Sequence, residues 1–101
     1  MSIIDRIREL GYDLPQAPKP VASYVPAVRV GNLIYTSGVL PVRDGELLYK
    51  NEVGGVQNNI DYGYEASKLC VLNALSVINE FTGLDTVERV VKLTGFVNSV
   101  S

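Results

Sequence analysis

The sequence predicts a single α+β domain in which a helix covers one face of a mostly antiparallel sheet. Two apolar runs flank Gly31-Asn32, and this pattern indicates a β-hairpin because Gly and Asn accept the positive φ of tight turns. Residues 60–82 repeat apolar side chains at helical spacing, and residues 86–100 form another β-rich run. A length of 101 residues fits one domain spanning 1–101.

The N-terminal part predicts a short helix followed by an extended linker. Ser2 is a suitable N-cap, and Asp5 stands three residues later at the position of a capping box. Gly11 is a natural helix end. The apolar residues of this helix share one stripe: Ile3, Ile4, Ile7 and Leu10. Three prolines in the next segment indicate extended chain along the surface: Pro15, Pro18 and Pro20.

The hairpin, within residues 24–41, is the centre of the predicted sheet. Its second strand ends in Thr36-Ser37-Gly38, a small polar cluster where backbone can approach a ligand. The continuous apolar run Leu33-Ile34-Tyr35 predicts a strand that is covered on both faces. We expect a helix on one face and a second sheet or another subunit on the other. Asp44-Gly45 then predicts a turn, and a short strand is expected at 47–49.

The long helix is expected at 60–82, with Asn59 as its N-cap and Gly83 as its end. Its predicted buried stripe consists of Tyr62, Ala66, Leu69, Cys70, Ala74, Val77, Ile78 and Phe81. Cys70 is therefore interpreted as a buried small hydrophobic side chain. The last predicted strand is followed at once by the end of the sequence, so we expect an incomplete sheet that finishes its core against a partner or further chain.

The amino-acid composition excludes several kinds of catalytic and binding site. Histidine is absent, which excludes imidazole catalysis and His-ligated metals within this chain. A single cysteine excludes an internal disulfide and suits a reducing cytosol, so a cytoplasmic location is expected. The net charge of −2 argues against a non-specific nucleic-acid binder. No run of 18 apolar residues is present, and no membrane span is expected.

Three stretches carry a resemblance to a known family. They are YVPAVRVGNLIYTSGVLP, EASKLCVLNALSVINEFTGLD and VERVVKLTGFVNS. Together, over about residues 20–99, they resemble the RidA/YjgF family of enamine/imine deaminases, some of which are described as L-PSP endoribonucleases. The pattern Gly-Asn-x-x-x-x-Ser-Gly-x-x-Pro beside the later helix and strand is specific, and the proline-rich start resembles the branch with longer N-termini.

The resemblance implies a chorismate-mutase-like α+β fold and a homotrimer with ligand clefts between subunits. It also implies hydrolysis of reactive imines without metal or cofactor, by an arginine that clamps the substrate carboxylate and an acidic residue that positions water. In the family both residues lie in the C-terminal third, after the strand that ends this sequence. Only a ligand-cleft role for Tyr24, Ser37 and Gly38 can be carried over. Val39 departs from the polar residue that most members have there.

Other polar residues are assigned simpler roles. Ser37 has no neighbouring base, so a hydrogen-bonding role is expected rather than a nucleophilic one. Arg29 and Arg43 are expected to form surface ion pairs, and Glu65 and Glu80 to be solvated. Three functions stay open: an imine deaminase acting on an imine, enamine or keto-acid ligand, a truncated non-catalytic binding or oligomer-forming module, and, more weakly, an endoribonuclease.

Overall fold

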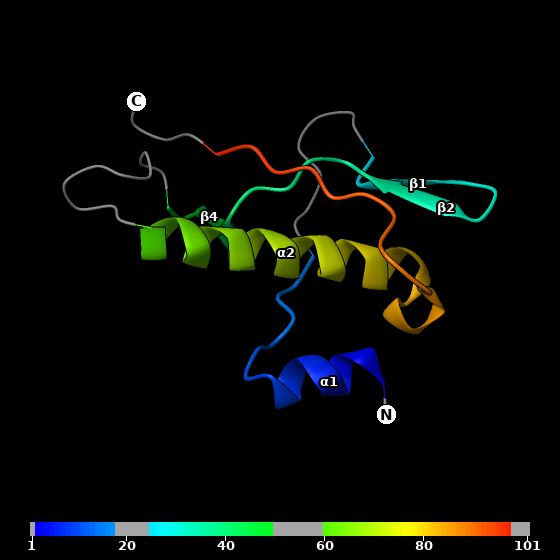
Figure 1. Cartoon of the computed structure of the whole chain (residues 1–101), viewed down its shortest axis with the longest axis horizontal. Coiled ribbons are helices and arrows are strands. Elements are labelled where there is room, and N and C mark those ends of the chain that lie inside the picture. The colour runs from blue at the N-terminus through cyan, green and yellow to red at the C-terminus, as the bar shows by residue number, and fades with distance from the viewer. Residues whose placement is uncertain (1, 18–24, 50–59, 98–101) are drawn as a thin grey trace.

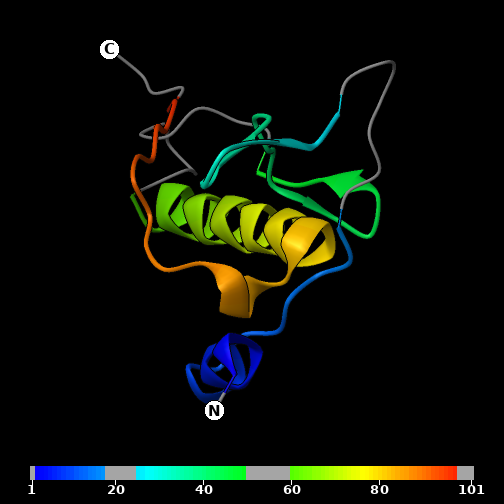
Figure 2. The same cartoon turned by 90° about the vertical axis from the view of Figure 1, so that its right-hand side faces the viewer.

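The computed structural model describes residues 2–17, 25–49 and 60–97, and the predicted N-cap Asn59 lies outside them. One long helix, α2 (Ile60–Thr82), runs through the middle of the molecule. The short helix α1 (Ile3–Glu9) lies on one side of α2, and two small hairpins lie on the other (Figures 1 and 2). The hairpin strands are β1 (Ala27–Val30), β2 (Leu33–Thr36), β3 (Val42–Arg43) and β4 (Glu46–Leu47). The α+β prediction is confirmed.

Both hairpins have two-residue turns. In the first, Val30 pairs with Leu33, and Gly31 takes a φ of 59°. In the second, Asp44 and Gly45 have φ values of 54° and 79°, as a type I′ turn requires. The Asp-Gly turn is thus confirmed, but the strand after it is β4 rather than 47–49. The described strands form separate two-stranded sheets, not one continuous sheet.

The capping box of α1 is confirmed. The backbone N–H of Asp5 donates to Ser2 Oγ at 3.1 Å, and the Ser2 N–H donates to Asp5 Oδ2 at 3.3 Å. A carboxylate from a distant part of the chain also binds this helix end: the Ile3 N–H donates to Asp85 Oδ1 at 2.8 Å. Asp85 lies in the 3-10 helix η1 (Leu84–Thr86), so α1 is joined to the segment that follows α2.

The bounds of α2 agree with the sequence prediction, and Gly83 at φ 86° follows its last residue. Its buried surface is wider than predicted. Leu72 joins Ile7 and Leu84 in a core cluster on the α1 side. Asn73 and Ser76 are also buried, whereas Cys70 is half-buried and Phe81 is 43% exposed. The single-stripe prediction was wrong at these positions because α2 is packed between two layers.

The predicted strand at 86–100 is not formed within the described residues. After η1, residues 87–97 have no assigned strand pairing and run from η1 to the hairpin side of α2 (Figures 1 and 2). Val87 is half-buried, but the apolar side chains of residues 90–97 are exposed, from 68% at Val97 to 94% at Phe96. The β-propensity of a residue reflects how its side chain packs on a sheet. A β-rich segment without a neighbouring strand lacks the backbone hydrogen bonds between strands that would hold it extended.

Candidate functional site

Ser37 is fixed at the open end of the first hairpin. Its backbone N–H donates to the Pro26 carbonyl at 2.9 Å, and its hydroxyl donates to the Val25 carbonyl at 2.5 Å. The hydroxyl is therefore engaged as a donor in a strand-end contact, which agrees with the expected hydrogen-bonding role. Tyr24, the other predicted cleft residue of this end, lies outside the described residues.

Gly38 faces open space. A methyl group built on its Cα would meet no atom within 4 Å, and its φ is not in the left-handed region. Nothing in the described chain therefore requires a glycine here, either for conformation or for packing. The backbone beside Ser37 is left accessible to a group from outside this chain.

Asn73 holds the segment that follows Gly38. Its Nδ2 donates to the Leu40 carbonyl at 2.9 Å and to the Val42 carbonyl at 2.8 Å. Asn73 is fully buried, and its Oδ1 has no hydrogen-bond partner among the described residues. The sequence prediction missed this residue. The available signal was its spacing, since it lies four residues from both Leu69 and Val77 and shares their buried face.

The first hairpin has one covered and one exposed face. Cross-strand partners point to the same side, and Ala27, buried at 6% exposure, lies on the side near α2. The opposite face, named here the apolar hairpin face, consists of Val28, Val30, Leu33 and Tyr35. These side chains are 43–62% exposed. The helix cover predicted for one face is present, and the second cover is not supplied by the described residues.

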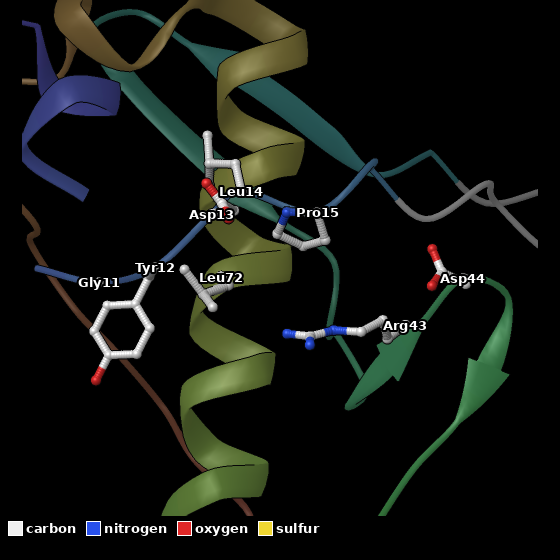
Figure 3. Close-up of a pocket in the computed structure, with 8 residues that line it drawn as sticks. All are labelled: Gly11, Tyr12, Asp13, Leu14, Pro15, Arg43, Asp44 and Leu72. Atoms are coloured by element: carbon white, nitrogen blue, oxygen red, sulfur yellow. The ribbon is translucent and has the colours of Figure 1, made fainter. Parts of the chain in front are cut away.

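The predicted ion pairs of Arg29 and Arg43 were wrong within the described residues. Arg29 Nε instead donates to the Gly31 carbonyl at 2.9 Å, which directs the guanidinium toward the hairpin turn and away from Ser37. Ion pairs in the described part join Arg6 with Glu9 and Lys68 with Glu65. Arg43 lines a cavity of about 360 Å³ between β3, α2 and the segment after α1 (Figure 3).

Two groups on α2 have shifted pKa values. Burial raises the pKa of the Cys70 thiol. A hydrogen bond with Tyr12, and secondarily Glu65, raises the pKa of Lys68. Lys68 Nζ also lies 4.3 Å from the centre of the Tyr64 ring. In the described ranges, no group of three or more acidic or Cys side chains is arranged to hold a metal, and no helix has the length and apolarity to cross a membrane.

Comparisons with known proteins agree with this fold. A curated protein, TCP17 of Trypanosoma cruzi, is 37% identical over 92% of this chain and 58% of its own length. The solved structure of Atu1372 from Agrobacterium tumefaciens, a protein of unknown function, has a TM-score of 0.82 and 37% identity. That match covers 97% of this chain and 60% of the other.

A second solved structure, a "putative endoribonuclease" from Shewanella oneidensis MR-1, has a TM-score of 0.75 and 30% identity over 82% of this chain and 54% of the other. The chain therefore spans little more than half the length of these relatives. Residues 5–101 match the family described as "YjgF/chorismate mutase-like, putative endoribonuclease". Because that match covers nearly the whole sequence, this chain belongs to the YjgF/chorismate mutase-like family.

Proposed function

We propose that this chain forms part of an enamine/imine deaminase that hydrolyses reactive 2-imino acids or enamines to 2-keto acids and ammonia. Tyr24, Ser37 and Gly38 would form one wall of the ligand cleft. The supporting observation is the accessible backbone at Gly38, next to a Ser37 that is fixed by two hydrogen bonds. Rigid placement of a polar strand end beside open space suits a small-molecule contact.

The reaction is a hydrolysis. Water adds to the imine carbon, its oxygen becomes the keto oxygen, and the nitrogen leaves as ammonia after taking up the protons of the water. An arginine clamp for the substrate carboxylate and an acid that positions water are expected from the part of the family domain that these 101 residues do not span. This chain contributes the cleft wall, and we assign residues 1–101 to a single domain.

The exposed apolar hairpin face supports the same proposal. The apolar hairpin face adjoins the Ser37 end and leaves four large apolar side chains exposed. Contiguous exposed apolar surface marks an interaction site. We propose a cytoplasmic homotrimer in which another subunit covers this face and completes the cleft. Val30→Lys should then shift the protein to monomers in light scattering. Leu10→Lys serves as the control, since this exposed apolar side chain lies at the end of α1 on the other side of α2.

Ammonia release from 2-iminobutanoate, generated in situ, tests the activity. We expect acceleration over buffer when residues 1–101 are joined to a segment that supplies the clamp and the acid. In that protein we expect a reduction of at least about tenfold in Gly38→Val, because the added side chain occupies the accessible space, and a smaller reduction in Ser37→Ala. Ser67→Ala is the control, since this exposed hydroxyl on α2 donates to the Gly63 carbonyl of its own helix. Folded wild-type protein that gives no acceleration would exclude catalysis by this chain.

A non-catalytic family member is the second candidate. It rests on the expectation that the clamp and the acid come from a part of the family domain that these 101 residues do not span, since the chain covers 54–60% of its relatives' lengths. This function predicts a defined oligomer that binds 2-ketobutanoate, loses that binding in Gly38→Val, and releases no ammonia. The endoribonuclease description of the family is tested with nuclease-free preparations, in which a rate of RNA cleavage sensitive to Ser37→Ala would favour that activity over both.

A further inference from the structure

A second part of the molecule forms an open cavity lined by exposed charged side chains. The cavity of about 360 Å³ lies between the segment after α1, the β3–β4 turn and α2 (Figure 3). It is lined by Gly11, Tyr12, Asp13, Leu14, Pro15, Arg43, Asp44 and Leu72. Neither Ser37 nor Gly38 lines it, so it is separate from the proposed deaminase cleft. Its volume falls within the range of small-molecule pockets.

Arg43 places a positive charge in this cavity. Figure 3 shows its guanidinium pointing from β3 toward Leu72 on α2. Within the described residues it has no hydrogen bond or ion pair, in contrast to Arg6, Arg29 and Lys68. A guanidinium presents a planar set of donors that fits a carboxylate in a bidentate manner. The free donors of Arg43 therefore suit a ligand carboxylate.

Negative charge lines the same cavity. Asp13 and Asp44 both contribute to its wall, and neither forms an ion pair with Arg43 or with another described residue. One cation and two carboxylates, held apart, complement a ligand that carries both charges. A simple anion would leave the carboxylates repelling it, and a simple amine would leave Arg43 without a partner.

Three apolar side chains form a smaller part of the wall. Leu72, only 8% exposed, Leu14 and Pro15 border the cavity. A smaller cavity of about 120 Å³ adjoins it and shares Tyr12, Arg43 and Leu72 with it. Its other lining residues are the apolar Leu48 and Leu69, together with Tyr49 and the ion-paired Glu65 and Lys68. We propose that this site binds a zwitterionic α-amino acid with an apolar side chain, its carboxylate on Arg43 and its ammonium attracted by the negative charge of Asp13 and Asp44, which lie on opposite sides of the cavity (Figure 3).

Calorimetric titration of the 101-residue chain with L-leucine tests the proposal. Two analogues separate the charges: 4-methylpentanoate lacks the ammonium, and 3-methylbutylamine lacks the carboxylate. We expect saturable binding of L-leucine and binding at least about tenfold weaker for each analogue, because each loses one charge-assisted contact. Amide resonances of Gly11, Asp13, Arg43 and Asp44 should shift in nitrogen-15 NMR spectra, and those of Ser37 and Gly38 should not.

Substitutions of the charged lining residues test which residue binds each charged group of the ligand. Arg43→Gln should weaken the binding of L-leucine about tenfold or more. Arg8→Gln, at an exposed position on α1, should leave that affinity unchanged. Asp13→Asn combined with Asp44→Asn should weaken the binding of L-leucine but not the binding of 4-methylpentanoate. Asn-Gly is as suitable as Asp-Gly for the type I′ turn, so this double variant should keep the β3–β4 geometry. Spectra of each variant must retain wild-type dispersion.

The proposal is overturned if L-leucine does not bind saturably, if 4-methylpentanoate binds as tightly, or if Arg8→Gln is as harmful as Arg43→Gln. Shifts confined to Ser37 and Gly38 would also overturn it and would assign leucine to the deaminase cleft. Because the readout is binding at separate resonances, absence of ammonia release would not affect it, and loss of leucine binding would not affect the proposed function.

Discussion

The two sides of α2 differ in how completely they are covered. On the α1 side, Ile7, Leu72 and Leu84 bury one another and are each no more than 8% exposed. On the hairpin side, Val28, Val30 and Tyr35 are 45–62% exposed, and Phe96 in the unpaired segment is 94% exposed. The helical side is thus completed by this chain, whereas the sheet side presents apolar surface that the described residues do not cover.

The difference follows from how the two kinds of element satisfy their backbone. A helix forms its hydrogen bonds within one segment, so α1 and α2 need only apolar packing between them. A strand depends on a neighbouring strand, and residues 87–97 have none in the described structure. A β-rich segment is therefore the part of a chain whose structure depends most on additional chain or subunits.

The largest expected effect separates the two sides directly. Leu84→Ala removes a side chain that is 3% exposed in the core cluster and should lower the free energy of unfolding by about 3 kcal/mol. Leu93→Ala removes the same atoms from a side chain that is 77% exposed and should change it by less than about 0.5 kcal/mol. Urea unfolding at low protein concentration measures both, and equal effects would contradict the comparison.

Asn73 tests the connection between α2 and the chain after Gly38. Asn73→Ala leaves the carbonyls of Leu40 and Val42 without their buried donors, and we expect a loss of about 2 kcal/mol. Ser67→Ala, on an exposed position of the same helix, is the control. Hydrogen exchange should show faster opening at 40–42 in Asn73→Ala. An unchanged urea midpoint would mean that these two bonds do not stabilise the fold.

Ser2 tests the attachment of α1. Ser2→Ala removes the acceptor for the Asp5 N–H, and we expect a loss of about 1 kcal/mol together with faster hydrogen exchange in α1. Ser2→Thr should retain most of the stability because it keeps the capping oxygen. If alanine were as stable as threonine here, the Asp85 carboxylate at the Ile3 N–H would be sufficient to hold the helix end.

The smallest expected effect is a change in the rate at which the Cys70 thiol is alkylated. Because burial raises the pKa of its thiol, less thiolate is present at any pH below that pKa than in an exposed cysteine. Iodoacetamide should therefore modify Cys70 several-fold more slowly than glutathione at pH 8, and its rate should rise at higher pH than that of glutathione. A rate equal to that of glutathione would show that this face of α2 is open in solution.

Local signals in the sequence were sufficient for the helices and turns. The capping box at Ser2 and Asp5, the bounds of α2 and the Asp44-Gly45 turn depend on contacts within a few residues, and all were predicted correctly. The predicted strand at 86–100 was wrong within the described residues because its formation depends on a partner strand. Tyr24, Ser37 and Gly38 remain predicted as cleft residues.

The sequence by itself determined the family, the α+β class and the positions at which the helices begin and end, since periodicity, caps and turn residues act locally. Only the tertiary structure decided which faces are buried, and it did so by placing α2 between two layers. That packing buried Asn73 beneath the segment after Gly38. It also placed Arg43 and Asp13 in the wall of one cavity. These residues are thirty positions apart in the sequence, and only the packing of their segments against α2 brings the opposite charges near each other.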